Sequence, residues 1–318
     1  MFLRKKLEAI YRSSLFSRHD IDGSIFYFSE ADFPGLKKNE YNFKNKKGET
    51  LRGWFFSYDG ADTDRIIVFD HGLSVGHRAY FREVEMLARR GYTVYTFDHT
   101  GCTYSEGAGI GGFVTSLTDL DYCIRALMSD YPDKKIAVVG HSRGGYSTLN
   151  IPAFHPTLTH IVAISGFSSV KDMQEQLIPS FAKKTRSHIY DVEARECPDY
   201  VTVAATDTLK NTAVKALIIH SADDRTVSVN HYRKLESALK DVPNIRFILV
   251  DGKVHNPHYT ADAVQYKDAF FKTYKKLKKQ KKLVTDEQKQ AFIKKYDWHR
   301  MTAQDDTVWA EIFKHLDT

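Results

Sequence analysis

Six short apolar segments, separated by stretches with helical patterning, constrain the fold of this chain more than any other feature. Each segment is rich in Val and Ile and lacks strict alternation of apolar and polar residues, which is typical of strands buried on both faces. Helix-like stretches at 79–91 and 116–131 lie between them. Alternating strands and helices predict right-handed crossovers and a mainly parallel sheet. The six segments are 65–72, 92–98, 135–142, 160–166, 215–221 and 245–252.

The region before these segments has a different pattern. Within residues 24–57, apolar positions partly alternate in three runs, 24–30, 38–45 and 49–58, joined by turns rich in Gly, Asn and Lys. Such runs predict a hairpin or meander at one edge of the sheet. Together the segments predict an α/β fold with a mostly parallel sheet of about eight strands, flanked by helices.

The interval between the fourth and fifth apolar segments holds about fifty residues, whereas a crossover needs about a dozen. We interpret it as an inserted helical cap; the alternative is two packed crossover helices without a functional role. Apolar residues in this interval would either line a pocket or simply pack: Met173, Leu177, Ile178, Phe181 and Tyr190. The predicted organisation is an N-terminal helical segment (1–23), a core (24–166 and 212–282), the cap (167–211) and a C-terminal helical tail (283–318).

Composition limits the classes of function. Hydrophobic residues make up 42% of the chain and charged residues 27%, which argues against global disorder. The net charge of +6 is concentrated in a lysine-rich stretch at 275–282 and does not predict nucleic-acid binding. The three scattered cysteines predict reduced thiols, without a zinc site. Charges interrupt every apolar run near the start of the chain, so we expect a cytoplasmic protein. No apolar run approaches the roughly 18 residues of a membrane-spanning helix, so we expect no stable membrane insertion.

The sequence Gly140-His141-Ser142-Arg143-Gly144 joins a strand-like segment to a helix-like one. This arrangement fits the G-x-S-x-G pattern, in which a tight turn exposes a serine hydroxyl above the sheet and glycines prevent clashes. The following helix directs backbone N–H groups toward any negative charge that forms nearby. The pattern predicts a nucleophilic serine at residue 142, although the pentapeptide also arises by chance.

A nucleophilic serine needs an imidazole to accept its proton and a carboxylate to orient that imidazole. Both should follow later strands, because the carboxyl ends of parallel strands meet at one edge of the sheet. Asp223 and Asp224 follow the strand at 215–221, and His255 follows the last strand. His258, three residues further on, is a competing base.

The ordered set of motifs resembles the α/β-hydrolase superfamily, and most closely its bacterial esterase, monoacylglycerol-lipase and serine-aminopeptidase-like branch, over residues 50–275. The acid-loop pattern of that family implies Asp224 as the catalytic acid, although Ser221 replaces its usual glycine. The final G-x-x-H pattern implies His255 as the base. The triad implied by the resemblance is therefore Ser142, Asp224 and His255.

The resemblance also implies an oxyanion hole. His71-Gly72 follows the first predicted parallel strand, where the family has its HG motif. The backbone N–H groups of Leu73 and Arg143 are the donors that this motif implies.

These residues predict a metal-independent serine hydrolase that cleaves small acyl esters through an acyl-enzyme intermediate and uses no cofactor. One alternative is a peptidase with the same triad, for which Glu193 and Glu196 are available to anchor a peptide terminus. Another is a catalytically silent binding protein on a hydrolase scaffold. The sequence leaves the acyl-chain length and the oligomeric state open.

Overall fold

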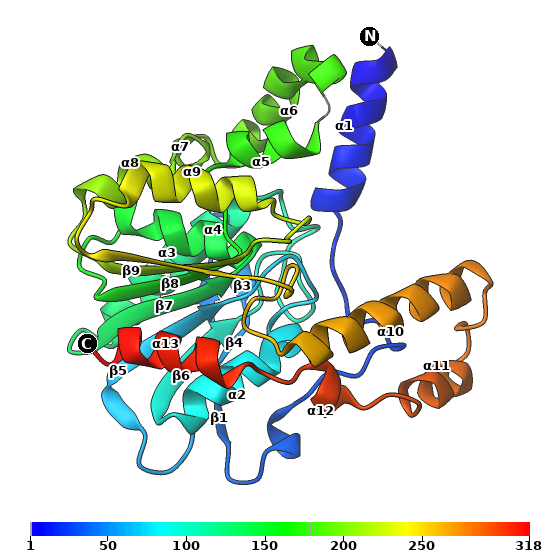
Figure 1. The fold of residues 1–318 in the computed structure, drawn as a ribbon, viewed down its shortest axis with the longest axis horizontal. Helices are drawn as coiled ribbons and strands as arrows, with labels where there is room; N and C mark the ends of the chain where they lie inside the picture. Colours follow the sequence, from blue (N-terminus) through cyan, green and yellow to red (C-terminus); the bar gives the residue numbers. More distant parts are fainter. Residues whose placement is uncertain (1, 179) are drawn as a thin grey trace.

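An eight-stranded sheet divides the protein into two helical layers (Figure 1). The computed structural model describes residues 2–178 and 180–318. The strand order is β1-β4-β6-β5-β7-β8-β9-β10, in which β4 is antiparallel to both of its neighbours and all other pairs are parallel. The predicted mainly parallel sheet of about eight strands is thus confirmed. The strands are β1 (Lys37–Glu40), β4 (Gly53–Ser57), β5 (Asp62–Asp70), β6 (Tyr92–Phe97), β7 (Lys135–His141), β8 (His160–Ile164), β9 (Lys215–Ser221) and β10 (Ile245–Val250).

The central strands bury apolar side chains on both faces, as their composition predicts. In β5, Ile66 and Val68 join the core on one face, whereas Ile67 and Phe69 join the core on the other. The first core lies under α3 (Val114–Asp130), α4 (Arg143–Asn150) and α9 (Val229–Leu239). The second lies under α2 (Phe81–Arg89) and α13 (Asp306–Leu316). The sheet is therefore a rigid platform between two apolar layers.

The predicted strand at 24–30 is wrong. This segment has no strand partner, and η1 (Glu30–Asp32) follows it. The Arg78 guanidinium donates hydrogen bonds to the backbone carbonyls of Tyr27 and Phe28, at 2.9 and 3.0 Å. The alternating aromatic residues instead pack on other aromatic rings, Phe26 against Trp298 among them. Side-chain packing thus produced a periodicity that resembles that of a strand.

The other two alternating runs do form strands. They supply β1 and β4 at the edge of the main sheet, and a separate two-stranded sheet formed by β2 (Phe43–Lys44) and β3 (Thr50–Leu51). The edge of the sheet is therefore antiparallel, as a meander requires.

The described part of residues 167–211 contains four α-helices between β8 and β9: α5 (Val170–Leu177), α6 (Lys183–Glu196), α7 (Pro198–Val201) and α8 (Ala205–Thr208). The N-terminal helix α1 (Phe2–Leu15) lies beside α6 at the top of the view in Figure 1. The buried Glu193 carboxylate of α6 accepts hydrogen bonds from the backbone N–H groups of Phe113 and Val114, both at 3.0 Å. It thereby caps α3, because those donors have no partner within the helix.

The C-terminal region leaves the sheet and then returns to it (Figure 1). Helices α10 (Ala261–Lys279), α11 (Asp286–Ile293) and α12 (Trp298–Met301) enclose a small apolar core that contains Phe270, Phe292 and Met301. Helix α13 then buries Trp309 and Ile312 against the sheet. No helix within the described ranges combines the length and apolarity needed to cross a membrane.

Candidate active site

Ser142 occupies a strained turn between β7 and α4. Its φ and ψ angles are 59° and −115°, in a region that non-glycine residues rarely adopt. Glycines on either side allow this turn to form. A Cβ on Gly140 would lie 2.2 Å from Thr148 Oγ1, and one on Gly144 would lie 2.0 Å from the carbonyl oxygen of Asp70. The chain thus accepts local strain that exposes one hydroxyl at the carboxyl end of the central strand.

His255 joins this hydroxyl to a carboxylate. Its Nε2 lies 2.9 Å from Ser142 Oγ, and its Nδ1 lies 2.8 Å from Asp224 Oδ2. The other oxygen of Asp224 accepts hydrogen bonds from the backbone N–H groups of Thr226 and Val227, at 2.8 and 3.1 Å. The buried carboxylate is therefore fixed in place and can orient the imidazole.

The competing candidates make other contacts. Asp223 Oδ1 accepts hydrogen bonds from Ser221 Oγ at 2.6 Å and from the Val254 N–H at 3.0 Å, so it fastens the loop that carries His255. Burial acts to raise the pKa of Asp223, but these hydrogen bonds lower it overall. His258 is fully buried, and its Nε2 lies 3.0 Å from Glu83 Oε1. Neither residue contacts Ser142.

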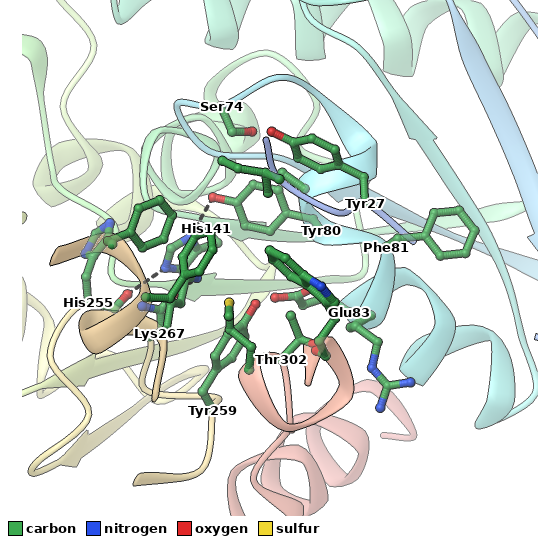
Figure 2. A pocket seen from close by; sticks show the side chains of 18 of the residues that line it. Tyr27, Ser74, Tyr80, Phe81, Glu83, His141, His255, Tyr259, Lys267 and Thr302 are labelled. Carbon is green, nitrogen blue, oxygen red and sulfur yellow. Dashed lines mark hydrogen bonds between the residues drawn. The ribbon is translucent and has the colours of Figure 1, made fainter. Parts of the chain in front are cut away.

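A neutral histidine, His141, holds the loop that carries His255. His141 Nε2 donates to the carbonyl oxygen of His255 at 2.7 Å, and the Tyr80 hydroxyl donates to His141 Nδ1 at 3.0 Å (Figure 2). The proton lies on Nε2 because a carbonyl oxygen only accepts hydrogen bonds. Burial lowers the pKa of His141 well below its ordinary value, which keeps the ring neutral. Sequence reasoning gave no indication of Tyr80.

The loop after β5 passes close to the serine. A Cβ on Gly72 would lie 3.1 Å from Ser142 Cβ, so glycine allows this approach. Leu73 follows and lines two cavities that His255 also lines. Arg143 opens α4, and its buried guanidinium donates to the carbonyls of Ile110 and Gly112 at 3.0 and 2.7 Å. Both backbone segments named from the sequence as oxyanion donors therefore adjoin the serine.

An apolar cavity of about 480 Å³, here called the acyl cavity, opens on Ser142. Core residues and helices α5 and α6 line it, and so does α1. The sequence did not lead us to predict that α1 lines a cavity, although it contains a signal for an apolar helix face. The signal was the spacing of Leu7, Tyr11 and Leu15, which recur on one face of a helix. Its apolar and aromatic lining includes Leu7, Ile10, Tyr11, Leu15, Phe113, Phe167, Met173, Leu177, Ile178 and Ile189.

Three of the five apolar residues noted in the cap, Met173, Leu177 and Ile178, line the acyl cavity. The other two do not. Phe181 is 82% exposed, and the Tyr190 hydroxyl donates to the carbonyl of Val201 at 3.1 Å.

The acids proposed as peptide anchors do not line the acyl cavity. Glu193 caps α3 and accepts a hydrogen bond from the Tyr11 hydroxyl. Burial raises the pKa of Glu193. Glu196 forms an ion pair with Lys47 at 2.9 Å. Neither carboxylate is available to a substrate in this cavity.

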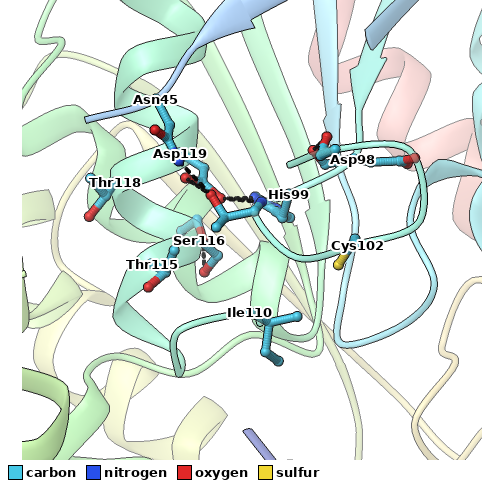
Figure 3. Close-up of polar contacts among 12 residues, drawn as sticks. Asn45, Asp98, His99, Cys102, Ile110, Thr115, Ser116, Thr118 and Asp119 are labelled. Atoms are coloured by element: carbon cyan, nitrogen blue, oxygen red, sulfur yellow. Dashed lines mark hydrogen bonds and ion pairs between the residues drawn. The ribbon is translucent and has the colours of Figure 1, made fainter. Parts of the chain in front are cut away.

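A second group of imidazole and carboxylate side chains lies at the same sheet edge and is fully buried (Figure 3). His99 Nε2 lies 2.6 Å from Asp70 Oδ1, and its Nδ1 lies 3.3 Å from Asp119 Oδ2. Asp119 also accepts hydrogen bonds from the N–H and the hydroxyl of Thr100, both at 2.9 Å. This cluster links β5, the loop after β6 and α3.

The sheet topology and the strained serine after β7 are those of the α/β-hydrolase fold. Comparisons with known proteins agree with this assignment. The model of the family described as "Serine aminopeptidase, S33" matches residues 61–202, a stretch that includes Ser142 and ends before Asp224 and His255. The monoglyceride lipases of Rattus norvegicus and Mus musculus are each 30% identical over 98 residues, which cover 30% of this chain and 32% of each lipase.

Solved structures show the same fold. An esterase of Pyrococcus furiosus superposes with a TM-score of 0.60 and 19% identity, covering 83% of this chain and 98% of that one. An acylaminoacyl peptidase of Pyrococcus horikoshii superposes with a TM-score of 0.52 and 19% identity, covering 70% of this chain and 38% of that one. The chain therefore has the α/β-hydrolase fold, and residues 61–202 are similar to the serine aminopeptidase S33 family.

Proposed function

We propose that this protein is a serine hydrolase that cleaves carboxylic esters through an acyl-enzyme intermediate. The observation that carries the proposal is the hydrogen-bonded series Asp224, His255 and Ser142 at the wall of an apolar cavity. Three residues far apart in the sequence adopt the geometry that activates a serine hydroxyl.

In the proposed reaction, Ser142 Oγ attacks the ester carbonyl while His255 Nε2 accepts its proton. Asp224 holds the imidazole and stabilises its charged form. The backbone N–H groups of Leu73 and Arg143 stabilise the oxyanion of the tetrahedral intermediate. His255 then gives its proton to the departing alkoxide. Water repeats the sequence on the acyl enzyme and releases the carboxylic acid.

The lining of the acyl cavity supports esters over peptides. An apolar cavity suits an acyl chain, whereas an aminopeptidase needs an acid to hold the ammonium group of its substrate. Glu193 and Glu196, the two candidates for that role, are engaged elsewhere. The esterase and lipase relatives agree with this preference, whereas the serine aminopeptidase family model and the acylaminoacyl peptidase agree with the peptidase alternative. The cytoplasmic location and the absence of a cofactor stay predictions.

Turnover of p-nitrophenyl esters of increasing chain length, compared with aminoacyl p-nitroanilides, tests this function. We expect the esters to be hydrolysed faster, and Ser142→Ala to lower kcat on the order of a millionfold. Faster hydrolysis of the anilides would favour the peptidase alternative. Equal activity of the wild type and Ser142→Ala would exclude the proposed nucleophile, and absence of turnover in both would favour the silent binding protein.

A further inference from the structure

A second cavity, here called the leaving-group chamber, adjoins the triad (Figure 2). Its volume is about 580 Å³, and its walls come from residues 25–28, the loop after β5, and helices α2, α10 and α12. Four residues border both this chamber and the acyl cavity: Leu73, Tyr80, Thr226 and His255. The two cavities therefore meet at the catalytic imidazole.

The triad gives the two cavities different chemical roles. Ser142 and Arg143 line the acyl cavity but not the chamber, whereas His141 and the loop of His255 line the chamber. The acyl group becomes bonded to Ser142 Oγ, so it occupies the cavity that the serine faces. The departing alkoxide takes its proton from His255 and must lie on the imidazole side. The chamber is therefore the compartment for the alcohol half of an ester.

Lys267 of α10 is a half-buried cation in the chamber wall (Figure 2). Its Nζ lies 3.5 Å from the neutral Asn256 Oδ1 and 4.7 Å from the centre of the Tyr259 ring. Across the described ranges, no carboxylate lies within ion-pairing distance of this ammonium group. Burial lowers the pKa of Lys267, while the charge of Glu83 acts to raise it. A bound anion would complete its hydrogen bonding.

The remaining wall combines this cation with aromatic surface. Phe26, Phe270 and Trp298 line the chamber and provide faces for a flat apolar group. One oxygen of the nearby Glu83 carboxylate is engaged, because Oε1 lies 3.0 Å from His258 Nε2, whereas the buried Oε2 has no hydrogen-bond partner among the described residues. Three further cations line the chamber, but Arg78 donates to the carbonyls of Tyr27 and Phe28, Arg82 lies 3.8 Å from Glu85 Oε2, and Lys275 is exposed. Lys267 is thus left as a half-buried ammonium for a ligand, and it matches a singly charged anion better than a phosphate, which would need several donors.

We propose that the leaving-group chamber binds an alcohol that carries an aromatic ring and a carboxylate, and that Lys267 binds this carboxylate. This inference rests on the proposed esterase function and specifies the substrate class. Lys267 acts on binding of the alcohol half and takes no part in proton transfer. It therefore affects KM for anionic substrates more than kcat.

A matched pair of substrates tests this inference: the butyrate ester of para-hydroxymethylbenzoate, and the same ester with the carboxylate replaced by a neutral amide. We expect the wild type to hydrolyse the anionic ester with a kcat/KM about tenfold higher, mainly through KM. Lys267→Met should abolish this preference, whereas Lys267→Arg should retain it. Lys276→Met is the control, because Lys276 is an exposed residue of α10 outside the chamber wall.

The outcomes separate this inference from the esterase proposal. Turnover without preference for the anionic ester, or a preference that persists in Lys267→Met, overturns the role of Lys267 and leaves the esterase intact. Loss of preference in Lys276→Met would point to general electrostatics and contradict a specific site. If neither ester is turned over and a fluorophosphonate does not label Ser142, the esterase proposal is overturned, and this inference with it.

Discussion

Two histidines of this protein contact carboxylates at the same edge of the sheet, yet their environments differ. His255 uses one ring nitrogen for Asp224 and offers the other to Ser142, and its side chain is 18% exposed. His99 has no exposed side-chain surface, and both of its nitrogens face carboxylates. The comparison teaches that a buried imidazole becomes suited to catalysis only when one nitrogen faces a substrate cavity and a hydroxyl.

The largest effect should come from removing the carboxylate that contacts His255. Asp224→Asn should lower kcat about ten-thousandfold with little effect on folding, because the amide favours the wrong tautomer of His255. Asp223→Asn is the matched control and should cost less than about tenfold, because Asp223 only fastens the loop. Steady-state ester hydrolysis measures both. If kcat falls more in Asp223→Asn than in Asp224→Asn, then Asp223 and not Asp224 is the catalytic acid.

In the buried cluster of His99, Asp70 and Asp119, here called the closed cluster, the corresponding substitution should affect stability instead of catalysis. Asp119→Asn removes one charge beside His99 and should lower the free energy of unfolding by about 3 kcal/mol. Urea denaturation measures this change. We expect kcat per folded molecule to stay near that of the wild type. A catalytic loss as large as that of Asp224→Asn would mean that the closed cluster takes part in the reaction.

The stability loss in Asp119→Asn should depend on pH. Burial acts to lower the pKa of His99, but Asp70 and Asp119 raise it above 6.5, its ordinary value. The charged ring therefore contributes its full stability below pH 6.5, and this contribution is lost as pH rises through the folded-state pKa. The deficit of Asp119→Asn should accordingly shrink at higher pH. A deficit that grows with pH would contradict a charged His99.

The smallest expected effect concerns the support beneath His255. Tyr80→Phe removes the hydrogen bond to His141 Nδ1, which should cost about 1 kcal/mol and lower kcat about fivefold. Tyr58→Phe is the control. The Tyr58 hydroxyl contacts Glu85, and neither Tyr58 nor Glu85 lines the acyl cavity or the leaving-group chamber. Kinetics with a short-chain ester check both variants. Equal kcat values would show that this hydrogen bond does not position the imidazole.

Much of the central fold could be predicted because it depends on local patterns. Buried parallel strands produce continuous apolar runs, and the tight turn at Ser142 requires glycines that the sequence displays. Candidates for the acid and the base followed from the rule that such residues occupy loops after later strands. The choice between Asp223 and Asp224 came from family resemblance, because the two neighbours are indistinguishable by spacing.

The features that could not be predicted depend on contacts between segments that are far apart in the sequence. The aromatic run at 24–30 alternates like a strand, but its carbonyls bond to Arg78. The spacing of Leu7 and Tyr11 predicts an apolar helix face but does not say which surface it covers. Lys267 lies in an ordinary amphipathic helix, and its role as a chamber cation emerges only from the packing of α10 against the catalytic loops. Local propensity does not encode such long-range packing.

The most direct test of the central claim is the site of covalent modification by a fluorophosphonate, located by mass spectrometry of peptides from the intact protein. We expect one adduct on Ser142, strongly reduced in His255→Ala and undiminished in His258→Ala variants that remain folded. An unmodified Ser142 in the folded wild type, or labelling that depends on His258 instead of His255, would contradict it.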